Sequence, residues 1–235
     1  MSQSKSIYRY GQYCPVARAV EILGDRWTLL IVRDLLTGTR HFNDLARGLP
    51  GISRGLLSGR LERLEEVGII EKLEIDEGRR STAYELTEAG DELLPVLEAL
   101  MHWGARWAFG QPLENELDPI LLLWWMRGRV HTERLPQERV VIRFDFQGAD
   151  DGTYWLVLKE DDVSICLHHP GFDLDVLVTA DIAAFYEVWL GRRAFWEAIR
   201  QRDVQVEAIP SLRRAFPDWF ALSHSAEAVR AAVNK

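Results

Sequence analysis

A chain of 235 residues has room for one large domain or for two domains of ordinary size. Hydrophobic residues make up 47% of it and charged residues 27%, which is enough for a buried core and argues against a disordered chain. The net charge of −8 argues against binding to nucleic acid over the whole surface, but it is compatible with a local basic face.

The sequence carries no sign of export or of membrane insertion. Its first twelve residues are polar and lack the apolar stretch of a secretory signal. The longest strongly apolar run, residues 120–126, is far shorter than the roughly 20 residues that cross a bilayer. Cys14 and Cys166 do not make a disulfide framework. We therefore expect a soluble, cytoplasmic protein.

Three helices are predicted in the first fifty residues. Residues 15–23 have apolar side chains at helical spacing behind a proline, which a first helical turn tolerates. Residues 27–36 form a second, largely buried helix, and residues 42–49 form a third. Pro50 and Gly51 then predict a tight turn into the next element.

The stretch from Ser53 to Gly68 is predicted to be a fourth helix. The Ser53 hydroxyl can accept a hydrogen bond from a free N–H at a helix start. Leu57, Leu61 and Leu64 recur at i, i+4 and i+7, so they form one apolar stripe. Gly68 ends the helix because glycine adopts left-handed conformations at no steric cost.

Two β-prone segments, residues 69–75 and 82–86, follow on either side of a turn that contains Arg79 and Arg80. A short helix followed directly by a hairpin with a basic tip is typical of the recognition helix and wing of a winged helix-turn-helix. Residues 42–49 are then the first helix of the motif. This arrangement indicates a protein that reads DNA, and the alternative is a helical hairpin in an ordinary core.

The predicted outward face of the fourth helix carries small side chains. A glycine costs about 1 kcal/mol relative to alanine inside a helix, so Gly55 and Gly59 indicate a close approach of the backbone to DNA or to another helix. Arg54 suits bidentate contact with guanine or a phosphate. The candidate DNA-contacting residues are Arg40, Ser53, Arg54, Gly55, Ser58, Gly59, Arg60, Arg63, Arg79 and Arg80.

Several spaced motifs carry a resemblance to a known family. They are Cys14-Pro15-Val16-Ala17-Arg18, Leu23-Gly24-Asp25-Arg26-Trp27-Thr28, Arg40-His41-Phe42-Asn43-Asp44-Leu45, Leu49-Pro50-Gly51-Ile52-Ser53, residues 57–64 and Tyr84-Glu85-Leu86-Thr87. Over about residues 8–108 the chain resembles the HxlR-type family of bacterial winged-helix regulators, within the MarR-like group. The resemblance implies a homodimeric transcription factor on double-stranded operator DNA, associated with the nucleoid. The chain departs from the family at Gly55 and Gly59, where members tend to carry longer polar or basic side chains.

The same resemblance gives Cys14 an alternative role. Some members of the family use an N-terminal cysteine at this place to sense oxidants or electrophiles. The other interpretation, which we prefer, is that Cys14 is a small buried hydrophobic residue.

The helix predicted after Thr87 carries a broad apolar stripe out to Phe109. A stripe of this width favours pairing between protomers over packing within the domain. A two-fold dimer would set two recognition helices about one DNA turn apart, ~34–36 Å, on a pseudo-palindromic site. The stripe consists of Leu93, Leu94, Leu97, Leu100 and Met101, with Trp103 and Trp107 as further candidates.

Residues 110–115 are polar, with glycine and proline, and they predict a linker between domains 1–110 and 115–235. The second domain begins with a helix over residues 117–129. From Val140 the hydrophobic period changes to two, in four runs separated by turns, which predicts an antiparallel meander. Helices over 179–190 and 192–200, a strand over 204–208 and a helix over 213–233 complete an α+β fold.

The second domain carries a second resemblance, in the order of its elements and in several motifs. The motifs are Phe144-Asp145-Phe146-Gln147-Gly148-Ala149-Asp150-Asp151-Gly152, Trp155-Leu156-Val157-Leu158, His169-Pro170-Gly171-Phe172-Asp173-Leu174-Asp175-Val176, Thr179-Ala180-Asp181 and Val188-Trp189-Leu190-Gly191-Arg192. Residues 117–210 resemble the sterol carrier protein 2-like fold, which implies an apolar ligand between sheet and helices. For any one of the aromatic residues, ordinary core packing is the better interpretation. The candidate pocket residues are Phe144, Phe146, Trp155, Leu156, Leu158, Ile165, Leu167, Val176, Val178, Phe185, Trp189, Phe195 and Trp196.

The sequence indicates no enzyme, and we predict no catalytic residue, no metal and no cofactor. Zinc patterns, phosphate-binding loops and nucleophile elbows are missing from it. The six histidines show no ligand spacing. We therefore expect a dimeric regulator whose second domain binds an apolar effector. The alternatives are a regulator that senses oxidants through Cys14 and a lipid carrier whose winged helix binds protein.

Overall fold

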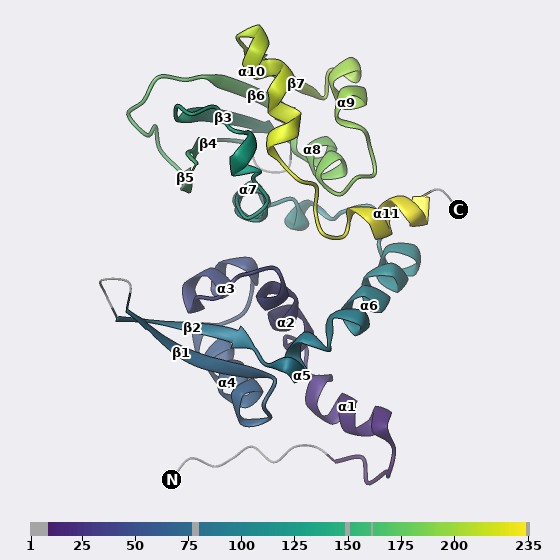
Figure 1. The fold of residues 1–235 in the computed structure, drawn as a ribbon. Coiled ribbons are helices and arrows are strands. Elements are labelled where there is room, and N and C mark those ends of the chain that lie inside the picture. The colour runs from purple at the N-terminus through teal and green to yellow at the C-terminus, as the bar shows by residue number, and fades with distance from the viewer. Residues whose placement is uncertain (1–8, 77–79, 149–150, 161, 234–235) are drawn as a thin grey trace. The chain divides into compact units, whose positions relative to one another are not determined.

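The computed structural model describes residues 9–76, 80–148, 151–160 and 162–233 (Figure 1). The chain divides into two compact units, Met1–Leu100 (unit 1) and Met101–Lys235 (unit 2).

Unit 1 consists of helices and one β-hairpin. Its helices are α1 (Pro15–Leu23), α2 (Thr28–Leu36), α3 (Phe42–Gly48), α4 (Arg54–Glu66) and α5 (Glu88–Asp91). The hairpin is β1 (Ile70–Asp76) and β2 (Arg80–Leu86), paired antiparallel from Ile70 opposite Leu86 to Asp76 opposite Arg80. Helix α6 (Leu94–Trp107) begins in unit 1 and ends in unit 2. The predicted helix-turn-helix and hairpin are confirmed.

One hydrophobic core holds the elements of unit 1 together. Its buried members come from α2, α3, α4 and the start of the hairpin, so packing of one side of α4 fixes the orientation of the helix. They are Ile31, Val32 and Leu35 of α2, Leu45 of α3, Leu49 after it, Leu57, Leu61 and Leu64 of α4, and Ile69 and Ile70 at the hairpin.

Local chemistry sets both ends of α4. The Ser53 hydroxyl accepts a hydrogen bond from the Leu56 N–H at 3.2 Å, as predicted for a helix cap. Gly51 turns the chain into the helix with φ +87°, and Gly68 turns it out with φ +73°. Both values lie in the left-handed region that glycine adopts without strain.

Unit 2 is built on a five-stranded sheet with the strand order β5-β4-β3-β6-β7. The strands are β3 (Val140–Gln147), β4 (Gly152–Leu158), β5 (Val163–Cys166), β6 (Val176–Asp181) and β7 (Val204–Ala208). The α-helices of unit 2, in addition to the end of α6, are α7 (Pro119–Arg127), α8 (Ile182–Trp189), α9 (Phe195–Gln201), α10 (Pro210–Ala215) and α11 (Ala226–Val233). Short 3₁₀ turns lie at η1 (Glu114–Glu116), η2 (Thr132–Arg134) and η3 (Phe216–Trp219).

The predicted antiparallel meander is wrong at its fourth strand. Strand β6 pairs parallel with β3, from Ile142 opposite Val176, and lies on the side of β3 away from β4. Asp175 fixes this register, because its N–H donates to the Val141 carbonyl at 3.0 Å and its carboxylate accepts from the Val141 N–H at 2.8 Å. Alternation along a strand indicates which face is buried, but it carries no information about the neighbouring strand.

Three predicted boundaries in unit 2 also differ from the structure. Residues 179–181 complete β6, so the helix predicted from residue 179 begins at Ile182. Leu167 and Leu174 lie outside the strands. The helix predicted over residues 213–233 is divided into α10, η3 and α11, with Pro217 in the short turn between them.

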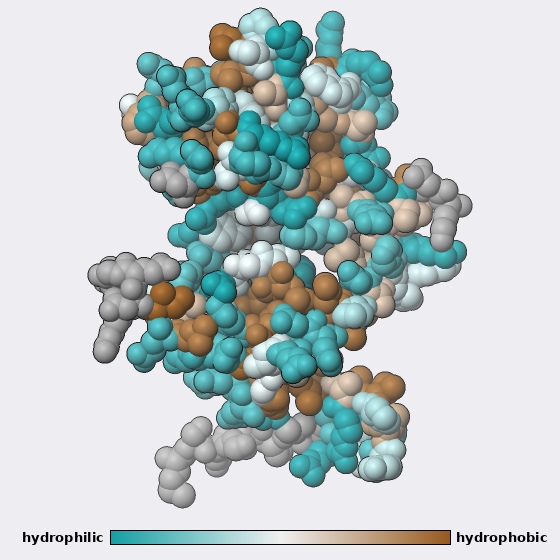
Figure 2. Space-filling model, in the orientation of Figure 1, coloured by the Kyte–Doolittle hydropathy of each residue, from teal (hydrophilic) through white to brown (hydrophobic). Residues whose placement is uncertain are grey.

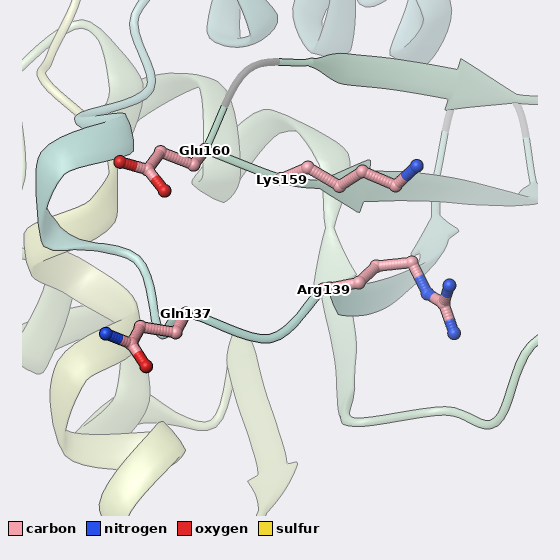
Figure 3. A pocket seen from close by; sticks show the side chains of 4 residues that line it. All are labelled: Gln137, Arg139, Lys159 and Glu160. Atoms are coloured by element: carbon pink, nitrogen blue, oxygen red, sulfur yellow. The ribbon is translucent and has the colours of Figure 1, made fainter.

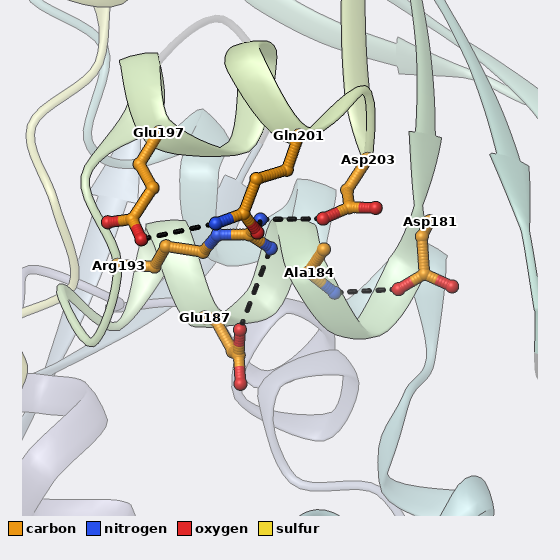
Figure 4. Close-up of polar contacts among 7 residues, drawn as sticks. All are labelled: Asp181, Ala184, Glu187, Arg193, Glu197, Gln201 and Asp203. Atoms are coloured by element: carbon orange, nitrogen blue, oxygen red, sulfur yellow. Dashed lines mark hydrogen bonds and ion pairs between the residues drawn. The ribbon is translucent and has the colours of Figure 1, made fainter.

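Polar contacts fasten α8 and α9 to the sheet (Figure 4). The Asp181 carboxylate caps α8 by accepting the Ala184 N–H at 2.8 Å. Arg193, in the connection between the two helices, donates to the Asp203 carboxylate at 2.6 Å and to the Gln201 side chain. Because Asp203 immediately precedes β7, Arg193 ties this connection to the edge of the sheet.

None of the helices in the described part of the chain is both long and apolar enough to span a membrane.

Candidate nucleic-acid interface

Helix α4 has one buried side and one open side. Leu57, Leu61 and Leu64 are 0–2% exposed and form its inner stripe. Gly55 and Gly59 lie on the opposite, exposed side. This division is the one that the leucine spacing predicts, and it leaves the open side free to approach another molecule.

Near the start of α4, two of the positions on its open side, Gly55 and Gly59, have no side chain. A methyl group added to Gly55 or Gly59 would meet no other atom within 4 Å, so neither glycine is required by packing inside this chain. Ser58 lies at the edge of this side and donates to the Glu62 carboxylate at 3.2 Å. Small side chains at the start of a recognition helix allow its backbone to come close to base edges.

Arg54 is the first residue of α4 and is held by two residues of α3. Its guanidinium lies over the Phe42 ring, 4.8 Å from the centroid, and its Nη2 donates to the Asn43 Oδ1 at 2.9 Å. Neither partner is charged, so the positive charge of Arg54 stays uncompensated by these contacts.

The other described candidate cations have acidic partners. Arg40 forms an ion pair with Glu85 of β2, and Arg60 forms one with Asp25. Arg63 pairs with Glu66, one turn further along α4, at 2.9 Å. These pairs reduce the positive potential that Arg40, Arg60 and Arg63 would present to a polyanion.

The wing is attached to the rest of unit 1 at its base. The Tyr84 N–H donates to the Arg40 carbonyl at 2.8 Å, and His41 forms an isolated bridge with Ala83. Arg79, at the predicted basic tip, lies outside the described residues. The Arg80 backbone belongs to β2, but the position of its side chain is also outside them.

Sequence reasoning missed the residues that hold the candidate cations. Asn43, Asp25 and Glu85 were not among the candidates, yet each contacts one of them. Asn43 is separated from Arg54 by 11 residues and Asp25 from Arg60 by 35. No periodicity joins positions so far apart, so these pairs could not be found without the fold.

Most of the predicted ligand-pocket residues lie in the core of unit 2. Ile165 and Phe195 are partly buried against that core, Trp155 is half-buried, and Leu167 and Trp196 are 52% and 50% exposed. The fully packed members are Phe144, Phe146, Leu156, Leu158, Val176, Val178, Phe185 and Trp189. Phe185 meets the Phe144 and Phe146 rings edge-on, with centroids 5.8 and 5.5 Å away.

A polar cavity of about 410 Å³ lies at the ends of β3 and β4 (Figure 3). Its lining residues are Gln137, Arg139, Lys159 and Glu160, none of which was a predicted pocket residue. Arg139 and Lys159 point to one side in Figure 3, whereas Gln137 and Glu160 point to the other. Among the described residues, no group of three or more His, Cys, Asp or Glu side chains is arranged to hold a metal ion.

Cys14 occupies the N-cap position of α1, where its side chain makes no capping hydrogen bond. It is half-buried, as is Cys166 on the edge strand β5, and both are free thiols. The structure therefore offers two cysteines of similar exposure in different surroundings.

The part of the chain that contains α4 is similar to known proteins. The HxlR-like helix-turn-helix family matches residues 22–111. YvaP of Bacillus subtilis, named an uncharacterized HTH-type transcriptional regulator, is 37% identical over 97 residues, which are 41% of this chain and 90% of YvaP. Mb3122 of Mycobacterium bovis, named likewise, is 46% identical over 89 residues, which are 38% of this chain.

The chain spans only 56% of the length of Mb3122. Among solved structures, the reduced form of the transcriptional regulator YodB from B. subtilis is 32% identical, with a TM-score of 0.37. That alignment covers 41% of this chain and 96% of YodB. On the 37% identity to YvaP over nine-tenths of its length, this chain belongs to the HxlR-like helix-turn-helix family.

Proposed function

We propose that this protein is a transcriptional regulator that reads operator DNA with α4. The observation that carries the proposal is the open side of α4. There a methyl group added to Gly55 or Gly59 would meet no atom within 4 Å, and the contacts of Arg54 with Asn43 and Phe42 leave its charge uncompensated. Membership in the HxlR-like family supports the proposal, as do its relatives, which are named HTH-type transcriptional regulators. A helix of this kind enters the major groove with its first residues nearest the bases.

Selection from random DNA tests this proposal. The purified full chain would select from a pool of random duplexes, and its affinity would then be measured by fluorescence anisotropy on the selected duplex and on a scrambled one. We expect the selected duplex to bind about a thousandfold more tightly, the low end for specific recognition. Equal binding of the two duplexes would show that the protein does not read sequence.

We also propose that the protein acts as a homodimer that pairs through α6. No residue of α6 is buried, and Val96, Leu100, Trp103 and Trp107 recur at spacings of four, three and four, so they form one exposed stripe. Trp103 and Trp107 are 60% and 65% exposed. A stripe of large, exposed apolar side chains is typical of a surface that binds another protein or a second copy of the same chain.

Two further exposed apolar side chains, Val16 and Val20, lie on α1, where Figure 2 shows apolar surface. A two-fold pair of such chains would place two copies of α4 on a pseudo-palindromic operator, ~34–36 Å apart. The spacing of half-sites in the selected duplexes would report this separation directly.

Light scattering after size-exclusion chromatography tests the dimer. We expect the wild type to have twice the mass of one chain and Trp103→Glu to have the mass of one chain. Glu98→Lys, on the side of α6 opposite the stripe, is the matched control and should leave the dimer intact. A monomeric wild type would overturn this part of the proposal.

For unit 2 we propose an effector role, with an apolar small molecule bound between the sheet and its helices, as in the sterol carrier protein 2-like fold that its sequence resembles. Phe185 and Trp189 of α8 pack against an apolar sheet face, and the ligand would take the place of part of this packing. Such a ligand changes DNA affinity only if it binds the DNA-competent and the DNA-incompetent states with different affinities. The coupling free energy between two such sites is typically about 1–3 kcal/mol.

Native mass spectrometry of the purified protein, compared with the mass under denaturing conditions, would detect a retained apolar compound. We expect an adduct that is lost on denaturation, and we expect the extracted compound to change affinity for the selected duplex. An adduct without that effect would make unit 2 a carrier domain, and the complete absence of an adduct would favour Cys14 as the sensor.

A further inference from the structure

We propose that Asn43 and Phe42 are positioning residues that set the base selectivity of the protein by holding Arg54. This inference rests on the proposed DNA-binding function and concerns the same site. It assigns selectivity to two residues of α3, the first helix of the motif, which act through Arg54.

The geometry fixes Arg54 in two independent ways. The Phe42 ring lies against the face of the guanidinium, 4.8 Å from ring centroid to Cζ, and so restricts the plane of the group. The Asn43 Oδ1 accepts from Nη2 at 2.9 Å, which restricts rotation within that plane. Phe42 is itself packed against the core of unit 1, so the platform under Arg54 cannot move freely.

The position of Arg54 makes this restraint useful. An arginine at the start of a recognition helix reads guanine when two of its N–H groups reach O6 and N7 together. The guanidinium has five N–H donors, and the hydrogen bond to Asn43 uses one of them. An unrestrained arginine loses rotamer freedom when it binds, whereas a restrained one has lost it beforehand.

The neutral partner distinguishes Arg54 from the other described candidates. Arg40, Arg60 and Arg63 are held by Glu85, Asp25 and Glu66. Those carboxylates orient the arginines but reduce the positive potential that they present to DNA. The amide of Asn43 orients Arg54 and leaves its charge available to DNA, because an amide carries no net charge.

A double-mutant cycle separates positioning from direct contact by Asn43. Asn43→Ala, Arg54→Ala and the double variant would be measured on the duplex that the wild type selects from random DNA and on its single-base variants. We expect Arg54→Ala to lower discrimination at one base pair by about tenfold to hundredfold. Asn43→Ala should lower it at that same base pair by about threefold to tenfold.

The double variant should discriminate between base pairs as well as Arg54→Ala alone does, because Asn43 acts through Arg54. If the two losses instead add, or if they fall on different base pairs, Asn43 contacts DNA by itself and the inference is wrong. Asn43→Asp provides a further comparison, since it keeps the acceptor but adds a carboxylate. We expect it to keep the preferred base while lowering affinity for every duplex.

A measurement on the protein without DNA tests the positioning of Arg54 separately from the proposed DNA-binding function. The Nε–H signal of Arg54 in ¹⁵N nuclear magnetic resonance should report an ordered side chain in the wild type and a mobile one in Asn43→Ala. An Arg54 signal that is equally mobile in both proteins would overturn the positioning role. Failure to select any duplex, with the Arg54 signal behaving as expected, would overturn the proposed function and leave the positioning contact standing.

Discussion

Arg60 of α4 forms an ion pair with Asp25, in the turn between α1 and α2. Both Arg60 and Arg54 are candidate DNA-contacting residues from the sequence, because both belong to the predicted fourth helix. Their contacts differ in kind, since Arg60 is tied to an acidic residue of its own domain.

We expect Arg60→Gln to lower the free energy of unfolding by about 0.5 kcal/mol, as for a partly exposed ion pair, with little change in the salt dependence of DNA binding. Arg54→Gln is the matched comparison and should weaken binding. Denaturant titration and anisotropy at several salt concentrations provide the two readouts. A fall of about 1 in the slope of log affinity against log salt for Arg60→Gln would instead identify Arg60 as a phosphate contact.

The glycines of α4 predict a separation of stability from binding. Gly55→Ala and Gly59→Ala should each raise the free energy of unfolding by about 0.5–1 kcal/mol, because the added methyl group meets no atom and alanine favours the helix. Both should weaken binding to the selected duplex, since the methyl group would lie between backbone and DNA. More stable variants with unchanged affinity would show that this side of α4 does not approach DNA.

Asp34 of α2 predicts a pH effect on the stability of unit 1. Its side chain is buried, and burial raises the pKa of its carboxyl group, an effect that Arg33 opposes by donating to Oδ1 at 2.8 Å. A carboxyl group whose pKa is higher in the folded state contributes stability at low pH, and that contribution is lost as the pH rises through the folded value. Asp34→Asn should therefore flatten this part of the pH dependence, as measured by denaturant unfolding from pH 4 upward.

Glu21 of α1 is the control with the opposite sign. The Tyr10 N–H and the Arg18 side chain donate to its carboxylate and lower its pKa. Its contribution is present above the unfolded pKa and is lost as the pH falls through the folded value. Glu21→Gln should change the acid side of the profile in the sense opposite to Asp34→Asn, and the same sign for both would contradict the assignment.

The two cysteines allow the thiol-sensing alternative to be tested directly. If the regulator responds to an apolar effector in unit 2 and not to oxidants, Cys14→Ser and Cys166→Ser should bind the selected duplex as the wild type does. This should hold before and after treatment with hydrogen peroxide. Cys166→Ser serves as the matched control, because both thiols are free and half-buried. Release of DNA by peroxide from the wild type and from Cys166→Ser, but not from Cys14→Ser, would make Cys14 the sensor.

Local patterns in this sequence predict the local structure well. The spacing of Leu57, Leu61 and Leu64 identifies both the helix and its buried side, and Ser53 and Gly68 mark where it begins and turns. These features depend on neighbours within a few residues, and that information is present in a single sequence.

Long-range pairings are the part that the sequence leaves open. Val176 and Val178 predict a strand with one buried face, yet the same pattern fits pairing with β5 or with β3. The partners of Arg54 and Arg60 are hidden for the same reason, since Asn43 and Asp25 come from other elements. The candidate interface was therefore predicted as a set of arginines, serines and glycines, and the division of its arginines by the charge of their partners required the fold.

The parallel pairing of β3 with β6 also has a consequence for how the chain is synthesised. Val141 and Asp175, which fix that register, are separated by 34 residues, whereas the β1–β2 hairpin closes on itself. Contacts of long sequence separation form late, and domains fold from the N-terminus as they leave the ribosome. We expect unit 1 to be complete while β3 still has one unpaired edge, so the nascent second unit is the part of this protein most exposed to aggregation.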